Sequence, residues 1–283
     1  MPDGRLVGMV GDVDEAGART KVAVVGATGK MGLLVSRIVE ESDTLELVAG
    51  LSSGDSLDGM NGADLVVDFT LPHVSQAVVD HAIGQGIPVV VGTSGWSSDR
   101  IDQLRSSAEA AGVGVVIIPN FSVGSVLATH FAAIAARYFD SIEIVEGHHA
   151  GKVDSPSGTA VRTAELIGAA RADLGPVEAP HVDQRARGQQ VASIPVHSMR
   201  LQGLLARQEV LFGGVGEVLS LRHDTYNSDS YSAGIQLALA AAPTIRGVVV
   251  GLDSLLGLGV PDNSGAEPVA DGAPSGQAAA TTP

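Results

Sequence analysis

Short apolar runs alternate with helical patterns through the first part of the chain. The run at 21–25 stops at Gly26, and apolar residues spaced three and four apart follow it from Met31 to Val39. Four further apolar runs have the length of strands and cover 45–51, 64–69, 88–91 and 113–118. Helical patterns lie at 73–84, between the second and third of these runs, and at 100–111, between the third and fourth. Apolar strands that alternate with helices are typical of a parallel sheet covered on both faces. Residues 20–121 are therefore predicted to form a doubly wound, Rossmann-type α/β domain.

The pattern changes after residue 121. An Ala-rich helix, a strand and a second helix are expected at 124–138, 141–146 and 158–172. Residues 174–190 contain proline and arginine without a regular period and are predicted to be a mobile loop. Strands separated by glycine-containing turns are expected at 191–200, 203–212 and 217–223. Residues 122–228 are thus predicted to form an α+β domain with a mixed or antiparallel sheet.

The last regular pattern is a helix at 231–242 followed by a strand at 247–252. We expect residues 229–261 to complete the first sheet, because one more α/β unit has no other obvious partner. Residues 1–19 are predicted to be a flexible N-terminal extension. Residues 262–283 are rich in Pro, Gly, Ala, Ser and Thr and are predicted to be a disordered tail.

The charge and the cysteine content of the chain exclude several classes of binding partner and site. The 283 residues include 17 Lys and Arg against 32 Asp and Glu, a net charge of −15. This balance argues against a nucleic-acid or anionic membrane surface, because both attract clustered basic residues. The absence of cysteine excludes disulfides and thiolate metal sites. The apolar runs are far shorter than the ~18 residues that a membrane span needs. A cytoplasmic globular protein is the expected class.

A glycine-rich turn joins the first predicted strand to its helix. It has the spacing GxxGxxG, and its residues before the last glycine are Gly26, Ala27, Thr28, Gly29, Lys30 and Met31. Glycine lets the backbone approach a phosphate, and the start of a helix offers free N–H groups and the positive end of the helix dipole. An ordinary tight turn is the alternative. The order of strand, turn and helix favours a dinucleotide site.

The choice between NADH and NADPH usually depends on the end of the second strand, where an acid binds the ribose. Ser52 occupies that position, and the nearest acid, Asp55, comes three residues later. Ser52 could accept a 2′-phosphate, so both nucleotides remain open.

Two later loops follow strands of the same predicted sheet. The first contains Gly92, Thr93 and Ser94, and the second contains Ile118, Pro119, Asn120 and Phe121. Ligands of open α/β sheets bind at the carboxyl ends of the strands, so both loops are candidates for cofactor contacts. Such residues are also common in turns without any ligand.

Residues that could carry chemistry are densest at 146–160. The candidates are His148, His149, Lys152, Ser157, Gly158 and Thr159. Ser157 or Thr159 is expected to cap the following helix, whose first N–H groups would bind an anion. Histidine and lysine beside an anion site suit a small carboxylate substrate that is protonated as it reacts. No metal site is predicted, because the two histidine rings should point to opposite sides of a strand and no third ligand is nearby.

Five segments, in this order, resemble the dihydrodipicolinate reductases, also called 4-hydroxy-tetrahydrodipicolinate reductases. They are VGATGKMG, DFTLP, VGTSGW, PNFSVG and EGHHAGKVDSPSGTA. The resemblance covers residues 21–258. It implies an oxidoreductase that reduces 4-hydroxy-tetrahydrodipicolinate to tetrahydrodipicolinate with NADH or NADPH, in the diaminopimelate and lysine pathway. It also implies a homotetramer built through the sheet of the second domain.

Positions within these segments imply roles for individual residues. His148 corresponds to the acid/base residue and Lys152 to the proton donor. His149, Gly158 and Thr159 correspond to residues that hold the substrate carboxylates, with Ser157 and Lys152 beside them. Residues 26–31, 92–94 and 118–121 correspond to the cofactor contacts.

The sequence departs from the family pattern at three notable positions. Ser52 replaces the usual acid, Gly151 precedes the lysine, and Ser228 stands where arginine is often found. Two alternatives to this function remain open. One is another two-domain Rossmann oxidoreductase such as an amino-acid dehydrogenase, and the other is a non-catalytic sensor of nicotinamide nucleotides. Retention of both His148 and Lys152 argues against the sensor.

Overall fold

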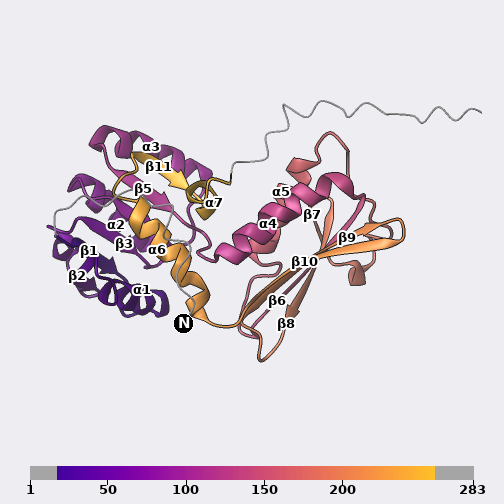
Figure 1. The fold of residues 1–283 in the computed structure, drawn as a ribbon, viewed down its shortest axis with the longest axis horizontal. Helices are drawn as coiled ribbons and strands as arrows, with labels where there is room; N and C mark the ends of the chain where they lie inside the picture. Colours follow the sequence, from indigo (N-terminus) through magenta and orange to yellow (C-terminus); the bar gives the residue numbers. More distant parts are fainter. Residues whose placement is uncertain (1–17, 259–283) are drawn as a thin grey trace, which may run out of the picture.

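Two β-sheets occupy separate lobes of an elongated molecule in the computed structural model (Figure 1). The structure describes residues 18–258. Apart from residues 18 and 19, the predicted N-terminal extension lies outside the described residues, as does the predicted tail at 262–283. The predicted fold class, a doubly wound α/β lobe beside an α+β lobe, is confirmed.

The first sheet has six parallel strands in the order β11-β5-β4-β3-β1-β2. They are β1 (Thr20–Val25), β2 (Leu45–Leu51), β3 (Leu65–Asp68), β4 (Val89–Val91), β5 (Gly114–Ile117) and β11 (Gly247–Val250). Successive side chains of a strand point to opposite faces of the sheet. Because helices cover both faces here, both sets of side chains must be apolar, which explains the valine runs of the inner strands. The strand order reverses between β1 and β3, and open α/β sheets bind ligands at such a switch point.

Helices cover both faces of this sheet. The elements on one face are α2 (Pro72–Gly84), α3 (Ser98–Ala111) and the 3₁₀ turn η2 (Leu57–Met60). Those on the other face are α1 (Lys30–Glu40), α6 (Ser232–Ala241) and α7 (Leu252–Leu255). The pairing of β11 with β5 places the last strand in the first sheet, and that strand ends at Val250 because α7 begins at Leu252. Within residues 18–258, no helix combines the length and apolar character needed to cross a membrane.

The second sheet is mixed and has the order β10-β9-β6-β8-β7. Its strands are β6 (Ser141–His148), β7 (Gln189–Val191), β8 (Ile194–Arg200), β9 (Ala206–Gly214) and β10 (Glu217–Thr225). Only β6 and β8 pair in parallel. The prediction of one strand at 191–200 is wrong. Ala192 and Ser193 both have positive φ and turn the chain between β7 and β8.

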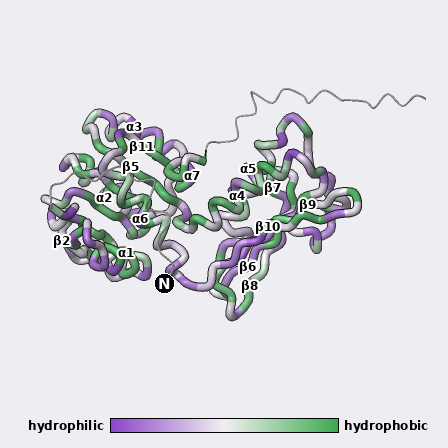
Figure 2. Tube along the Cα trace, in the orientation of Figure 1, coloured by the Kyte–Doolittle hydropathy of each residue, from purple (hydrophilic) through white to green (hydrophobic). Residues whose placement is uncertain are grey.

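One face of the second sheet is packed by α4 (Val123–Ala135) and α5 (Gly158–Ala170), through a core that includes Ile144 and Phe212. Three further 3₁₀ turns are η3 (Ala136–Tyr138), η4 (Arg185–Arg187) and η5 (Ser228–Tyr231). Among the described elements, no helix covers the opposite face (Figure 1). The inner strands of the first sheet are mostly hydrophobic, whereas the second sheet mixes hydrophilic and hydrophobic segments (Figure 2). This difference follows from covering one sheet on both faces and the other on one.

Candidate active site

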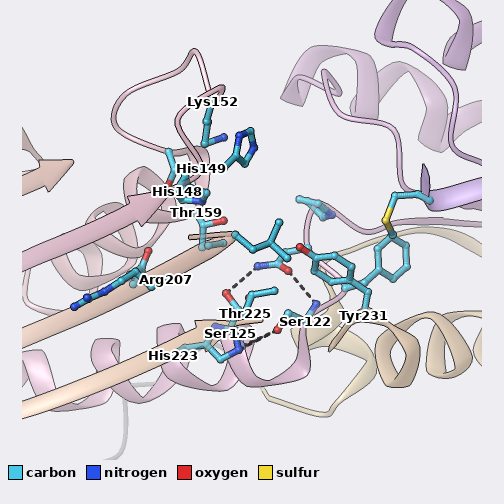
Figure 3. Close-up of a pocket in the computed structure, with 18 of the residues that line it drawn as sticks. Ser122, Ser125, His148, His149, Lys152, Thr159, Arg207, His223, Thr225 and Tyr231 are labelled. Atoms are coloured by element: carbon cyan, nitrogen blue, oxygen red, sulfur yellow. Dashed lines mark hydrogen bonds between the residues drawn. The ribbon is translucent and has the colours of Figure 1, made fainter. Parts of the chain in front are cut away.

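A cavity of about 430 Å³ lies between the two lobes and is lined by residues from both (Figure 3). The predicted site residues in its wall are Lys30, Met31, Gly92, Pro119, Asn120, Phe121, His148, His149, Lys152, Ser157 and Thr159. The cavity therefore brings the carboxyl edge of the first sheet together with the histidine and lysine cluster of the second lobe.

Other predicted site residues do not line this cavity. They are Gly26, Ala27, Thr28, Gly29, Ser52, Thr93, Ser94, Ile118 and Gly158. The side chain of Ile118 is buried in the core of the first sheet, and the buried Thr93 hydroxyl donates to the carbonyl of Asp68 at 3.4 Å. Because these two side chains are buried in the first lobe, only the backbone atoms of Thr93 and Ile118 can contact a ligand.

The glycine-rich turn at the end of β1 has little room for side chains. Gly26 has a φ of +84°, and a Cβ there would lie 2.4 Å from the carbonyl oxygen of Phe69. A Cβ on Gly32 would lie 2.1 Å from the carbonyl oxygen of Gly26. Gly29 is the N-cap of α1 and provides no side-chain cap. The start of α1 therefore presents backbone N–H groups at the switch point of the sheet, as a phosphate site requires.

The carboxylate of Asp55 lies at the end of β2, although Asp55 comes three residues after Ser52 in the chain. One carboxylate oxygen of Asp55 accepts hydrogen bonds from the backbone N–H of Ser52 at 2.7 Å and from its hydroxyl at 2.8 Å. These backbone and side-chain hydrogen bonds hold the pKa of the Asp55 carboxyl below its usual value. The turn after β2 thus folds Asp55, three residues along the chain, back onto Ser52.

His148 is the last residue of β6, and its ring orientation is set by Glu146. The Nδ1 atom of His148 lies 2.6 Å from Oε2 of Glu146, whose side chain has no exposed surface. Donation from Nδ1 to the carboxylate leaves Nε2 of the neutral ring as an acceptor. Burial lowers the pKa of His148, and the attraction of Glu146 offsets only part of that effect. The lowered pKa favours the neutral ring.

Glu146 remains ionised although it is buried. Burial raises its pKa, but hydrogen bonds from Ser198, His148 and Arg200 outweigh this effect and hold the pKa below its usual value. Sequence reasoning assigned no role to Glu146 or Arg200. Glu146 lies two residues before His148 on the same side of a strand, which was a usable signal. Arg200 has no such signal, because it comes from β8, 54 residues away from Glu146.

Lys152 and His149 lie in the loop after β6. The Nζ atom of Lys152 lies 2.8 Å from a carboxylate oxygen of Asp154, so the ammonium is paired at the edge of the cavity. His148 and His149 both line the cavity (Figure 3). The alternation of a strand stops at His148, where β6 ends. Among residues 18–258, no group of three or more His, Cys, Asp or Glu is placed to hold a metal ion.

The start of α5 forms the wall beside this loop. Ser157 is the N-cap, and its hydroxyl accepts from the N–H of Ala160 at 3.3 Å. Thr159 also faces the cavity. Within the described chain, the N–H groups of Gly158 and Thr159 have no hydrogen-bond acceptor. Free N–H groups at a helix start attract an anion.

Several polar residues in the wall were not predicted. They come from β9, β10 and η5 and are Arg207, Gln208, His223, Thr225 and Tyr231. Burial lowers the pKa of His223 and raises the pKa of Tyr231. No motif marked these positions, because separate strands bring them to the cavity. Ser228 begins η5 but does not line the cavity.

The chain matches two family models, described as the N-terminus and the C-terminus of dihydrodipicolinate reductase, over residues 20–121 and 124–256. A 4-hydroxy-tetrahydrodipicolinate reductase from Clavibacter sepedonicus is 61% identical over 273 residues, which cover 93% of this chain and 99% of the relative. A protein of the same name from Streptomyces griseus is 46% identical over 248 residues, covering 85% and 99%.

Solved structures show the same likeness. The dipicolinate-bound dihydrodipicolinate reductase from Paenisporosarcina sp. TG-14 is 32% identical with a TM-score of 0.74, covering 83% of this chain and 99% of that one. An amine dehydrogenase from Mycobacterium smegmatis has a TM-score of 0.56 at 11% identity, covering 84% and 96%. The second match shows a shared fold alone, so the alternative of an amino-acid dehydrogenase is not favoured.

Proposed function

The chain belongs to the dihydrodipicolinate reductase family, and from this premise we propose that the cavity between its lobes is the active site. The reaction of this oxidoreductase is the NADH- or NADPH-dependent reduction of 4-hydroxy-tetrahydrodipicolinate to tetrahydrodipicolinate, in the diaminopimelate and lysine pathway. One observation supports the proposed site above all. A single cavity joins the switch point of the first sheet to His148, Lys152 and the start of α5.

The turn after β1 and the loops after β4 and β5 fit a nicotinamide dinucleotide. Gly26 and Gly32 stand where a Cβ would collide with backbone, and the start of α1 is open to a pyrophosphate. The residues proposed to contact the cofactor are Gly26, Ala27, Thr28, Gly29, Lys30, Met31, Gly92, Thr93, Ser94, Ile118, Pro119, Asn120 and Phe121. When bound, the nicotinamide supplies a hydride to C4 of the substrate ring.

The start of α5 fits a carboxylate of the substrate. The free N–H groups of Gly158 and Thr159 provide two donors, and the Ser157 hydroxyl lies beside them. His149 and Lys152 supply further donors from the adjacent loop. Dipicolinate, present in the Paenisporosarcina relative, is a ring dicarboxylate like the substrate of this reaction. We therefore place a small cyclic dicarboxylate between α5 and the first lobe.

His148 and Lys152 divide the proton transfers. Nε2 of neutral His148 removes a proton from C5, which is acidic because it adjoins the imine carbon, while Lys152 protonates the leaving 4-hydroxyl as water. After hydride transfer to C4, the His148 imidazolium returns its proton to C5. Lys152 then recovers a proton from solvent. The overall reaction consumes one hydride and one proton and releases one water.

A coupled spectrophotometric assay tests this function. A synthase generates the unstable substrate from pyruvate and aspartate semialdehyde, and loss of NADH or NADPH absorbance is followed. Oxidation that depends on the synthase is the expected result. No oxidation of either nucleotide, by folded protein that binds one of them, would contradict the proposed reaction.

The Ser52–Asp55 pair is expected to favour NADH over NADPH. Its negative charge stands at the end of β2, where a 2′-phosphate would be repelled. Asp55→Asn should tighten NADPH binding by about 5- to 30-fold and change NADH binding by less than about threefold. Ser52→Asp should weaken NADPH binding selectively. Dissociation constants from nucleotide fluorescence check both results. Asp102→Asn on α3 makes the same change in net charge away from β2, and an equal effect from it would contradict the local role of Asp55.

We propose that the uncovered face of the second sheet joins copies of this chain into a homotetramer. Val218 and Met199 point to that face and are 70% and 36% exposed. Around them lie ion pairs, including Glu143 with Arg187 and His197. Exposed apolar side chains among satisfied charges are typical of a surface that contacts another subunit.

Val218→Glu should shift the assembly toward smaller species, because a charge on an apolar contact opposes its burial. Light scattering after size-exclusion chromatography measures the mass directly. Val48→Glu places the same charge on β2 of the first lobe, where Val48 is 43% exposed, and should leave the mass unchanged. A tetramer that persists unchanged in Val218→Glu would contradict the role of this face.

A further inference from the structure

Arg200, at the end of β8, contacts the side chain of Glu146 through both of its terminal nitrogens. Nη1 donates to both carboxylate oxygens of Glu146 at 3.0 Å, and Nη2 donates to Oε1 at 3.0 Å. The Arg200 side chain is 19% exposed and the Glu146 side chain is fully buried. A forked guanidinium–carboxylate contact of this kind restricts both charge and geometry. The same carboxylate accepts a hydrogen bond from Nδ1 of His148 at 2.6 Å. Glu146 therefore connects Arg200 to the proposed base.

The remaining donors of Arg200 reach the loop after β6. Nε donates to the carbonyl of Lys152 at 3.3 Å, and Nη2 donates to the carbonyl of Asp154. Lys152 and Asp154 are themselves joined by an ion pair of 2.8 Å. One guanidinium thus holds the backbone at Lys152, the residue proposed as proton donor, and again two residues after it.

We propose that Arg200 is a positioning residue, which fixes the Glu146–His148 pair and the Lys152 loop in one arrangement. The proposal rests on the proposed roles of His148 and Lys152. Arg200 does not line the cavity, so it acts through these residues and not on the substrate. A guanidinium suits this task better than an ammonium, because its fixed planar fork can bond several oxygens in different directions.

Charge makes the arrangement sensitive to loss of Arg200. A buried carboxylate that loses its counter-charge either takes up a proton or attracts a proton to a neighbouring group such as His148. The charged groups facing His148 are Glu146 on β6, Lys152 in the loop and Arg200 on β8. Other titratable groups in the wall are His149 in the same loop, Lys30 on α1, Arg207 on β9, His223 on β10 and Tyr231 in η5. Arg200 opposes protonation of His148, so its removal should make the ring easier to protonate.

Two substitutions separate the charge of Arg200 from its shape. Arg200→Met removes both, and should lower kcat by about 10- to 100-fold and move the acidic limb of the kcat/KM profile to higher pH. Arg200→Lys keeps the charge without the fork. It should lower kcat by about tenfold while the acidic limb stays near that of wild type. NADH binding, measured by fluorescence, should remain within about twofold of wild type in both variants, since the cofactor loops belong to the other lobe.

Arg137 provides a matched control in the same lobe. Its guanidinium bonds the carbonyl of Ala170 at 2.7 Å and pairs with Asp173 at 3.2 Å, and it does not line the cavity. Arg137→Met removes a partly buried arginine of similar contacts without touching Glu146. Its kcat and pH profile should match wild type once the fraction of folded protein is measured by circular dichroism.

The outcomes separate the positioning role from the proposed chemistry. If Arg200→Met folds and retains kcat and the acidic limb, the positioning role is wrong. If it does not fold, Arg200→Lys decides, and unchanged kcat in that variant overturns the proposal. If His148→Gln retains wild-type activity, the proposed base is wrong whatever Arg200 does. Loss of activity in His148→Gln, with none in either Arg200 variant, rejects only the role of Arg200.

Discussion

Replacing Lys152 with alanine is expected to lower kcat by about 10²- to 10⁴-fold and leave nucleotide affinity within about twofold of wild type. Lys152 lines the cavity together with His148 and His149, on the side of the second lobe (Figure 3). Without it, the leaving hydroxyl has no positioned acid and one substrate carboxylate loses a cation. Steady-state kinetics with NADH measures kcat, and fluorescence titration measures nucleotide binding without turnover.

Lys21→Ala is the control for loss of a lysine charge. Lys21 lies in β1, outside the cavity wall, and its side chain is exposed. This variant should have wild-type kcat. A Lys152→Ala enzyme that turns over at the wild-type rate would remove Lys152 from the mechanism, and a loss of nucleotide affinity as large as the loss of kcat would indicate a binding role.

His148→Gln is expected to lower kcat by about 10²- to 10⁴-fold and to abolish the acidic limb of the kcat/KM profile. The sign follows from the neutral ring. Nε2 accepts a proton only while it carries none, so activity is full above the pKa of His148 and falls as the pH drops through it. Burial lowers this pKa from the ordinary value of 6.5, so the wild-type limb should have its midpoint below about 6.5.

Profiles of kcat/KM between about pH 5 and 9 check this prediction. His81→Gln is the matched control, since His81 on α2 bonds Asn61 at 3.0 Å and does not line the cavity. That variant should retain both the rate and the limb. An acidic limb that survives in His148→Gln would assign the titration to another group.

Local patterns predicted the first lobe well. The valine-rich strands β3, β4 and β5 are short apolar runs between helical periods, and such runs have few other structures available in water. The glycine turn was equally readable, because Gly26 needs a positive φ and Gly32 needs space beside Gly26. The turn at Ala192 and Ser193 was missed, since neither residue favours the left-handed region that it occupies.

The active-site network could be read only in part. His148, His149 and Lys152 stand within five residues of one another, so a motif reveals them, and the N-cap at Ser157 follows from local chemistry. The sequence shows Asp55 three residues after Ser52, but its contact with Ser52 depends on the turn after β2. The sequence grouped His148 and His149 in one site, and both line the cavity.

The local sequence was enough to predict which segments form strands and helices, where the glycine turn lies and which short motif the proposed proton chemistry depends on. These features depend on side-chain period, backbone freedom and neighbours along the chain. The contact of Arg200 with Glu146 and the cavity shared by both lobes became visible only in the folded chain. Such contacts join residues far apart in the chain through strand order and packing, which no local period encodes.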